Sequence, residues 1–289
     1  MNRELFFLWL SRMIVTIFGK KISHRFLRLF YNNLSPKVKG RLISVPYLLG
    51  TDILVNTKDI IGWKIYFFNE YESSTNNLLR KIIENNTVII EAGANIGSET
   101  LLISKLNPDG KIFAFEPAPI PFSLLQFNVA NNQLGNVKVY QEAVGETAGK
   151  LKLHLLPKEF PNQGLSSIKE HSKSVQSIQV PMTTVDLLVE KFDLERLDLI
   201  KMDVQGAEFL ILNGGLKSLK KFGPKILLEA SSEFLNLEVV LRFLENNDYL
   251  VYAFDNEKLS KVDVNHLIEG NWICFHRDDV FHDKIIREW

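Results

Sequence analysis

Glycines and an acid lie together in the segment EAGANIG, which runs from Glu91 to Gly97. An apolar run precedes it, so the segment is expected to turn from a strand into a helix. Gly93 permits a tight turn, and Gly97 lets the helix pack closely on the strand. A dinucleotide site would have a glycine at position 95 to let the backbone touch a pyrophosphate, but Asn95 stands there. Glu91 beside the turn favours a cationic ligand over a phosphate.

A second acid, Glu116, ends the next apolar run, 19 residues after Gly97. At that place in an open α/β sheet, a carboxylate accepts hydrogen bonds from both ribose hydroxyls of a bound nucleoside. Glu91 and Glu116 without a phosphate glycine therefore predict a nucleoside that carries a cationic group. S-adenosylmethionine (SAM), with its ammonium and sulfonium, fits this pattern, whereas NAD fits it poorly.

Two more acids follow later apolar runs, Asp203 in KMDVQGAE and Glu229 in LLEAS. Adjacent parallel strands lie about 4.8 Å apart, so these carboxylates could converge. They could bind Mg²⁺, or their repulsion could raise one pKa and make that group the general base for an acceptor hydroxyl. Two alternatives stay open: Asp203 only caps a helix and orients the SAM ammonium, or His154 is the base.

Apolar strand-like runs alternate with helix-like stretches from residue 76 onward. Strands are expected at 87–93, 111–117, 137–144, 197–203 and 225–231, and helices at 97–106, 119–133, 206–220 and 233–246. This alternation is typical of a parallel sheet covered on both faces. The last two runs, 249–255 and 271–277, have no long helix between them and are expected to pair antiparallel. The prediction is a Rossmann-like α/β fold, with a mostly parallel seven-stranded sheet and an antiparallel last strand.

Residues 147–186 are expected to overhang the strand ends at which ligands bind. Two extra strands are predicted there, at 151–157 and 177–185, with a loop around residues 162–167 between them.

The N-terminal segment differs from the rest of the chain in charge. Residues 1–41 carry nine Lys or Arg and one acid, whereas the remaining residues carry 25 Lys or Arg and 33 acids. The apolar run at residues 5–18 would span about 21 Å as a helix, short of the roughly 30 Å bilayer core. Three interpretations stay open: a helical appendage packed on the main domain, a basic interfacial helix on an anionic membrane through residues 1–30, or a dimer contact.

The composition is that of a globular protein without an internal disulfide. The 289 residues are 46% hydrophobic and 24% charged, which is ordinary for a globular chain, and the one cysteine, Cys274, excludes an internal disulfide. The acidic body gives no reason to expect nucleic-acid binding. We expect three parts, a basic segment at 1–41, lead-in strands or a cap at 42–75, and the SAM-binding domain at 76–289. A cytoplasmic location is expected, with peripheral contact at the inner membrane face as the alternative; the oligomeric state stays open.

The chain resembles the FkbM family of SAM-dependent methyltransferases over roughly residues 65–255. The segments that carry the resemblance are YFFNEYE (66–72), VIIEAGANIG (88–97), IFAFEPAP (112–119), LLQFNVANN (124–132), EAVGE (142–146), GLSS (164–167), TTVD (183–186), LIKMDVQGAE (199–208) and ILLEAS (226–231). The resemblance implies SAM as the methyl donor and O-methylation of a hydroxyl on a sugar, glycan, glycolipid or natural product. Two positions depart mildly from the family pattern, Glu91 where Asp is commoner and Gln205 where Glu is common.

Site residues follow from the resemblance position by position. The methionine part of SAM would be held by Glu91, Gly93, Asn95 and Gly97, and the ribose by Glu116. Glu142 and Ala143 would lie beside the adenine, and Glu72 near the ammonium. For Asn128 and Asn132, four apart on one helix, helix packing or capping is expected instead of ligand binding.

Two other functions stay in view. A binding protein could keep the fold and lose the chemistry. A nucleotide-dependent oxidoreductase could share the broad fold, but Asn95 and the antiparallel end of the sheet argue against it.

Overall fold

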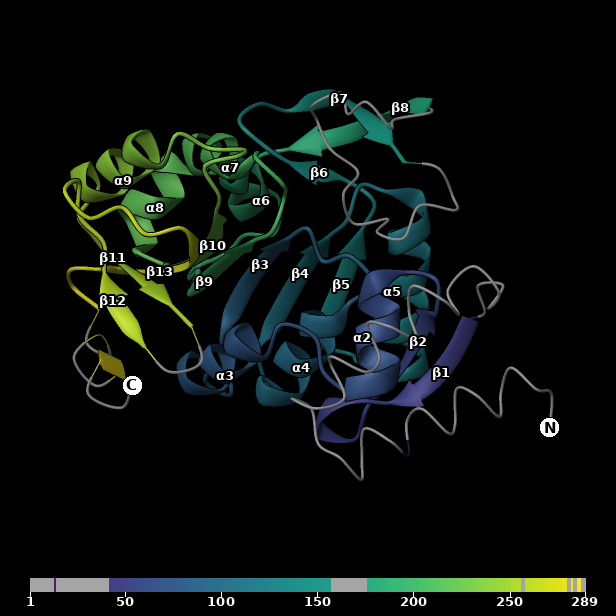
Figure 1. Ribbon diagram of the computed structural model, residues 1–289. Helices are drawn as coiled ribbons and strands as arrows, with labels where there is room; N and C mark the ends of the chain where they lie inside the picture. Colours follow the sequence, from purple (N-terminus) through teal and green to yellow (C-terminus); the bar gives the residue numbers. More distant parts are fainter. Residues whose placement is uncertain are drawn as a thin grey trace, which may run out of the picture.

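The computed structural model describes residues 13, 42–156, 176–255, 258–279, 282, 285 and 286, with an eight-stranded sheet at its centre (Figure 1). The strand order is β12-β11-β13-β10-β9-β3-β4-β5. Five neighbouring strands are parallel: β5 (Val137–Tyr140), β4 (Lys111–Phe115), β3 (Val88–Ala92), β9 (Leu199–Met202) and β10 (Lys225–Ala230). They confirm the parallel sheet predicted from the apolar runs.

The other side of the sheet is antiparallel. The strand β13 (Gly270–His276) lies between β10 and β11 (Tyr249–Phe254) and runs antiparallel to both. The antiparallel last strand of the prediction is therefore confirmed. The short strand β12 (Leu259–Lys261) pairs with β11 and adds an eighth strand to the seven that were expected.

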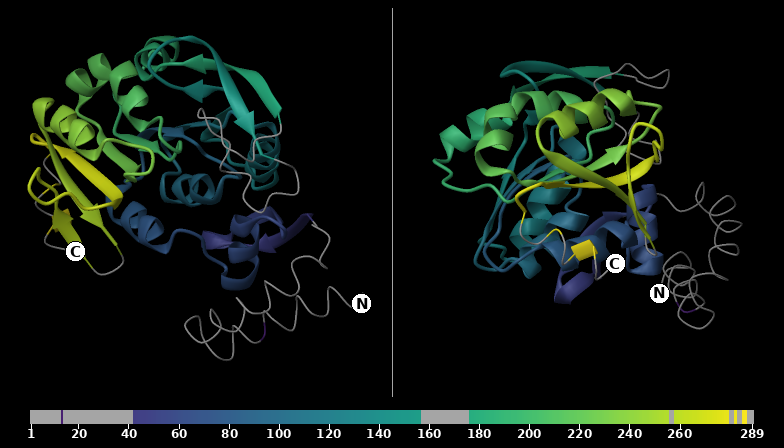
Figure 2. Two further views of the ribbon diagram at one scale, coloured as in Figure 1. Left: turned by 45° about the horizontal axis from the view of Figure 1, so that its top comes forward. Right: turned by 90° about the vertical axis from the view of Figure 1, so that its left-hand side faces the viewer.

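Helices cover both faces of the sheet (Figures 1 and 2). One face carries α2 (Ile60–Phe68), α3 (Ser73–Ile82), α4 (Ser98–Leu106) and α5 (Pro119–Asn131); the other carries α6 (Val185–Lys191), α7 (Glu208–Gly214), α8 (Leu216–Phe222) and α9 (Leu237–Asn246). Side chains of β3 alternate between the two cores, with Ile89 in the first and Val88 and Ile90 in the second. The helix predicted at 206–220 is wrong in one respect, because it breaks at Gly215 into α7 and α8.

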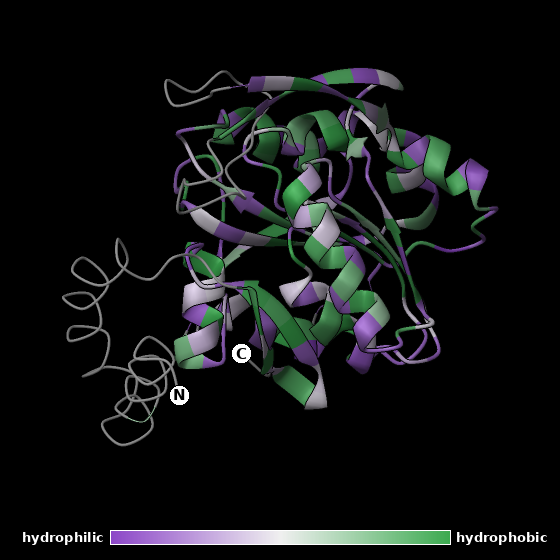
Figure 3. Ribbon diagram, turned by 90° about the vertical axis from the view of Figure 1, so that its right-hand side faces the viewer, coloured by the Kyte–Doolittle hydropathy of each residue, from purple (hydrophilic) through white to green (hydrophobic). Residues whose placement is uncertain are grey.

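A small second sheet stands at the carboxyl end of the parallel strands, above β4 and β5 in Figure 1. It contains β6 (Ala143–Val144), β8 (Gln176–Thr183) and β7 (Gly149–Leu155) in that order. The strand predicted at 137–144 is thus two strands, since β6 leaves the central sheet and pairs with β8. The two extra strands expected in this region are confirmed. Hydrophilic and hydrophobic residues alternate along this sheet in Figure 3, as expected for strands with one covered face.

The segment that precedes the parallel sheet is tied to it through side chains of α5. The strands β1 (Leu42–Pro46) and β2 (Asp52–Asn56) form a hairpin around the 3-10 turn η1 (Leu48–Gly50). Asn128 Oδ1 accepts from the Leu54 N–H at 2.7 Å, and Asn128 Nδ2 donates to the Leu54 carbonyl at 3.2 Å. Asn132 makes the same pair of bonds to Asp52, at 2.8 and 2.6 Å. The two side-chain amides thus make the backbone hydrogen bonds that a neighbouring strand would make to β2. This confirms the packing role expected for them.

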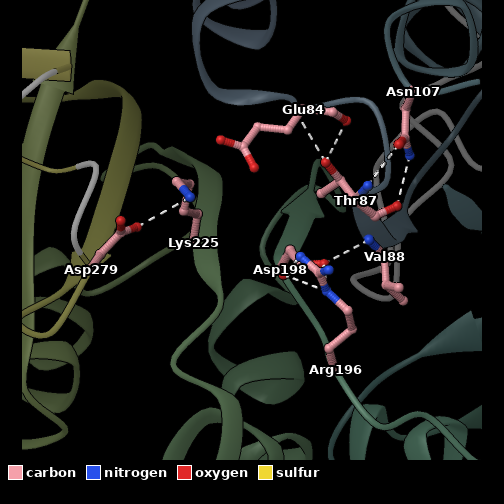
Figure 4. Close-up of polar contacts among 8 residues, drawn as sticks. All are labelled: Glu84, Thr87, Val88, Asn107, Arg196, Asp198, Lys225 and Asp279. Atoms are coloured by element: carbon pink, nitrogen blue, oxygen red, sulfur yellow. Dashed lines mark hydrogen bonds and ion pairs between the residues drawn. The ribbon is translucent and has the colours of Figure 1, made fainter. Parts of the chain in front are cut away.

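Polar contacts fasten the opposite, amino end of the strands (Figure 4). Asp198 accepts from the Val88 N–H at 2.8 Å and pairs with Arg196, while Asn107 accepts from the Thr87 N–H at 2.7 Å. The ammonium of Lys225 lies 3.2 Å from the carboxylate of Asp279. These side chains hold strand ends to loops.

The predictions for residues 1–41 and for the loop at 162–167 fall outside the described residues, apart from Met13. Within the described residues, no helix is both long enough and apolar enough to cross a membrane.

Candidate active site

Two cavities open at the carboxyl ends of the parallel strands, and they adjoin because Asp203 and Gln205 line both. The first is also lined by Gly93, Phe115, Glu116, Pro117, Glu142, Ala143, Val144, Leu151, Leu153, Val204 and Ala207. The second, of about 310 Å³, is also lined by Tyr71, Glu72, Thr75, Glu99, Lys201, Met202, Leu227, Leu228, Glu229, Gly270 and Asn271. A ligand with two chemically different ends could occupy both.

The turn between β3 and α4 brings the chain to the first cavity. Gly93 has φ +80°, and a Cβ added there would lie 1.9 Å from the Asp203 carbonyl oxygen. Gly97 has φ +90°, and its Cβ would meet the Leu125 side chain at 2.8 Å. Both positions therefore require glycine, as the sequence predicted.

Three residues other than glycine adopt the left-handed backbone conformation around the two cavities: Glu72 (φ 53°), Asn95 (φ 51°) and Gln205 (φ 52°). Each costs roughly 1 kcal/mol or more relative to ordinary backbone, and such outliers cluster at functional sites. Five further residues of the described part of the chain share this conformation and line neither cavity, so the conformation supports a functional role only together with the cavities themselves.

Glu116 lies at the end of β4 and fixes the turn after β3. Its carboxylate accepts from the Asn95 N–H at 2.9 Å and from the Ala118 N–H at 2.8 Å. Burial raises the pKa of Glu116 to about 7, although these two hydrogen bonds lower it. Each carboxylate oxygen keeps a lone pair for a further donor, such as a ribose hydroxyl.

The structure brings four predicted cofactor residues to the first cavity: Gly93, Glu116, Glu142 and Ala143. Leu151 and Leu153 of β7 line the same cavity, so the small sheet supplies an apolar wall there. The overhang predicted for residues 147–186 is thus confirmed for β7, whereas residues 157–175 lie outside the described part of the chain.

Glu91 occupies a different position from the one the sequence suggested. It is fully buried in β3, directly opposite Lys201 of β9 in the parallel register, and lines neither cavity. Its carboxylate lies 3.4 Å from the Lys201 ammonium and accepts from the Thr100 hydroxyl at 2.7 Å. Burial alone would lower the pKa of Lys201, but Glu91, Glu99 and Asp203 outweigh burial and raise it. Glu91 can therefore reach a ligand only through Lys201, which does line the second cavity.

Asn95 and Gly97 also line neither cavity. Asn95 acts through its backbone, which binds Glu116, and Gly97 is the N-cap of α4.

Asp203 and Glu229 converge at the second cavity, as predicted from adjacent strand ends. The Gln205 amide donates to both, at 3.2 Å to Asp203 Oδ1 and 3.1 Å to Glu229 Oε2. Burial raises the pKa of Glu229, and the charges of Asp203 and Glu72 raise it further. A carboxylate with a raised pKa is a stronger base.

Glu72 lies at the second cavity, as expected, and Tyr71 and Glu99 lie there without having been predicted. Glu99 could not be recognised from the sequence as a site residue, because an acid in the first turn of a helix also stabilises that helix. Burial raises the pKa of the Tyr71 hydroxyl, as do the surrounding carboxylates, Glu72 first among them.

Glu208 and His154 are not part of the candidate catalytic set. Glu208 accepts from the N–H groups of Val204 and Gly206 and so holds the loop that carries Asp203 and Gln205. His154 lies on β7 and lines neither cavity. Among the described residues, no group of three or more His, Cys, Asp or Glu side chains is arranged to hold a metal ion.

The sheet order, with the antiparallel β13, and the two cavities at the carboxyl edge are those of the Rossmann-like fold of class I methyltransferases. The model of the methyltransferase FkbM domain matches residues 91–251, more than half of the chain. The protein belongs to the FkbM methyltransferase family.

The individual relatives share a third or less of their aligned residues with this chain. The methyltransferase sdnD of Sordaria araneosa is 33% identical over 159 residues, which cover 46% of this chain and 61% of that protein. The 2-O-methyltransferase NoeI of Sinorhizobium fredii is 30% identical over 146 residues, covering 46% and 59%. The crystal structure of methyltransferase FkbM from Methylobacillus flagellatus has a TM-score of 0.45 at 16% identity, covering 67% of this chain and 44% of that one. The chain spans about three fifths of the length of the two curated relatives.

Proposed function

We propose that the protein transfers a methyl group from SAM to a hydroxyl of a small-molecule or glycan acceptor, on a sugar, a glycolipid or a natural product. One observation carries this proposal. A cavity lined by Glu116 continues into a cavity lined by four carboxylates: Glu72, Glu99, Asp203 and Glu229. A nucleoside with a cationic tail matches that order of groups. The name of the relative NoeI, a 2-O-methyltransferase, supports an oxygen acceptor.

The residues of the first cavity suit the adenosine part of SAM. Glu116 would accept from the ribose hydroxyls, and Glu142, Ala143 and the apolar wall from β7 would enclose the adenine. The turn at Gly93, Asn95 and Gly97 would support the methionine part, with Glu72 near its ammonium and Glu91 acting through Lys201. When bound, SAM supplies an electrophilic methyl carbon.

The protein's part in catalysis is to align the acceptor oxygen and remove its proton, because an alcohol is a weak nucleophile. Glu229 and Asp203 face the second cavity, where an acceptor would lie beside the cofactor. We assign proton removal to this pair, with Gln205 holding both carboxylates in place.

Calorimetric titration tests the cofactor assignment. Micromolar SAM binding with no NAD binding is the expected result. Folded protein that binds no SAM would contradict the enzyme proposal, and NAD binding would favour an oxidoreductase. SAM binding without turnover on any acceptor would favour a protein that binds SAM but does not catalyse.

Asp203→Asn and Glu229→Gln test the catalytic pair. With an acceptor found by screening, at least one variant is expected to lower kcat about 100-fold or more, because positioned general bases contribute about 10² to 10⁴. Radiolabelled methyl transfer is the measurement, and the exposed Glu233→Gln is the control. Wild-type kcat in both variants would remove the pair from the mechanism. The same assay with EDTA, then with Mg²⁺ restored, tests whether these carboxylates act through Mg²⁺.

For residues 1–41 we propose peripheral contact with an anionic membrane, through residues 1–30 at the cytoplasmic face. The basic and apolar composition of this segment supports the proposal. Co-sedimentation with anionic vesicles compares the full chain with a deletion of 1–41, and equal pelleting would contradict it.

A further inference from the structure

One buried carboxylate at the second cavity has an oxygen without a partner. Glu99, in the first turn of α4, is 5% exposed and lines the cavity. Its Oε2 accepts from the Ser98 hydroxyl at 2.7 Å, whereas its Oε1 is buried and has no hydrogen bond. A buried charged oxygen without a partner is costly, so it requires an explanation. The adjoining cavity is where a ligand for this oxygen would lie.

The charges around Glu99 do not balance. Among the described residues, Lys201 is the one basic side chain that lines the cavity, and it pairs with Glu91. Two buried carboxylates, Glu91 and Glu99, therefore share one ammonium, and a negative charge remains. Burial raises the pKa of Glu99 to about 7, with Glu91 and Glu72 adding to it against Lys201 and Ser98. Near pH 7 a proton thus partly supplies the missing positive charge.

We propose that Glu99, beside the Glu91–Lys201 pair, is the binding site for a primary ammonium group. A guanidinium prefers both oxygens of a carboxylate, but Ser98 already occupies one oxygen of Glu99. A compact ammonium needs only the free Oε1 and can give its other hydrogens to neighbouring acceptors.

The ammonium has two chemical sources. One is the amino group at the amino-acid end of SAM, and this source rests on the proposed function. The other is an amine on the acceptor. The continuity of the two cavities through Asp203 and Gln205 favours the SAM source.

The test compares two ligands that differ in the amino-acid end. S-adenosylhomocysteine has the ammonium, whereas 5′-methylthioadenosine keeps the nucleoside and thioether but lacks it. In the full-length protein, Glu99→Gln is expected to weaken S-adenosylhomocysteine binding about tenfold or more, since it removes the negative charge that strengthens the hydrogen bond to the ammonium. Binding of 5′-methylthioadenosine is expected to stay within about twofold, which also shows that the variant is folded.

Glu84→Gln is the matched control, because Glu84 is exposed. It lies near Thr87 at the amino end of the strands (Figure 4). This variant is expected to change neither affinity. Equal weakening of both ligands by Glu99→Gln would overturn the proposal, since it would indicate a structural role. Wild-type protein that binds neither ligand would contradict the proposed function instead.

A second arm tests the acceptor as the source. Protein saturated with S-adenosylhomocysteine is titrated with glucosamine, and with N-acetylglucosamine as the uncharged control. The site would be assigned to an acceptor amine if the wild type binds glucosamine but not N-acetylglucosamine. In that case Glu99→Gln should lose glucosamine binding while its affinity for S-adenosylhomocysteine is unchanged. If Glu99→Gln changes the affinity for neither S-adenosylhomocysteine nor glucosamine, the proposal is overturned.

Proton release gives a readout that packing alone would not change. The titratable and charged groups that face Glu99 are Tyr47, Tyr71, Glu72, Glu91 and Lys201. An arriving cation lowers the pKa of Glu99, so S-adenosylhomocysteine should release more protons at pH 7 than 5′-methylthioadenosine does. Calorimetry in phosphate and in Tris measures this excess. It should disappear in Glu99→Gln, and in the wild type it should shrink as the pH rises from 7 to 8, where Glu99 is already largely ionised.

Discussion

Gly93→Ala is expected to lower the free energy of unfolding by about 3 kcal/mol or more. The added Cβ would lie 1.9 Å from the backbone oxygen of Asp203, and backbone cannot move aside as a side chain can. Forcing atoms into packed space costs about 1–3 kcal/mol, and the left-handed φ of +80° adds roughly 1 kcal/mol. For a chain of this size, the loss corresponds to a fall in Tm of about 6 °C. Urea and thermal unfolding measure it.

Gly50→Ala separates the two causes. Gly50 has a similar φ of +73°, but a Cβ there meets nothing within 4 Å. This variant should therefore lose only the conformational part, roughly 1 kcal/mol. Equal losses in the two variants would show that the close approach of β3 and the Asp203 loop does not govern stability.

Glu116→Ala is expected to weaken SAM binding by about 100-fold or more. The carboxylate is the proposed acceptor for two ribose hydroxyls, and each hydrogen bond to a charged group contributes about 1.5–3 kcal/mol. The variant also leaves the N–H groups of Asn95 and Ala118 without their acceptor, so the turn after β3 loses its support. Calorimetric titration with SAM is the measurement.

Two further variants make this result specific. Glu116→Gln keeps the shape and one carbonyl oxygen, so its SAM affinity should lie between those of Glu116→Ala and the wild type. Glu146→Ala, at an exposed position after β6, should bind SAM as the wild type does. A dissociation constant for Glu116→Ala within threefold of the wild-type value would rule out Glu116 as the ribose acceptor.

The adenosine half of the site could be predicted because it depends on strand ends. Apolar runs show where strands stop, and parallel strands place their carboxyl ends at one edge. Gly93, Glu116 and Glu142 therefore meet at one cavity, although they come from different parts of the chain. The same rule predicted the convergence of Asp203 and Glu229.

The other half depends on contacts that no local pattern reveals. Glu91 is neutralised because the register places it opposite Lys201, and register between distant strands cannot be read from either strand alone. Glu99 is buried because the segment before the parallel sheet packs over α4, which brings Tyr47 and Tyr71 near its carboxylate. The break at Gly215 and the short strand β12 also depend on tertiary packing.

The position of β13 sets the order in which the sheet can be completed during protein synthesis. β10 and β11 are synthesised before β13. They do not pair with each other, because β13 lies between them and pairs with both. At about 5–20 residues per second, translation from Phe254 to His276 takes on the order of seconds. Throughout that interval one edge of β10 has N–H and C=O groups that its partner has not yet reached, and such edges pair readily with other chains. A chain that is released before Gly270 is added thus exposes a strand edge that the finished protein keeps at the centre of its sheet.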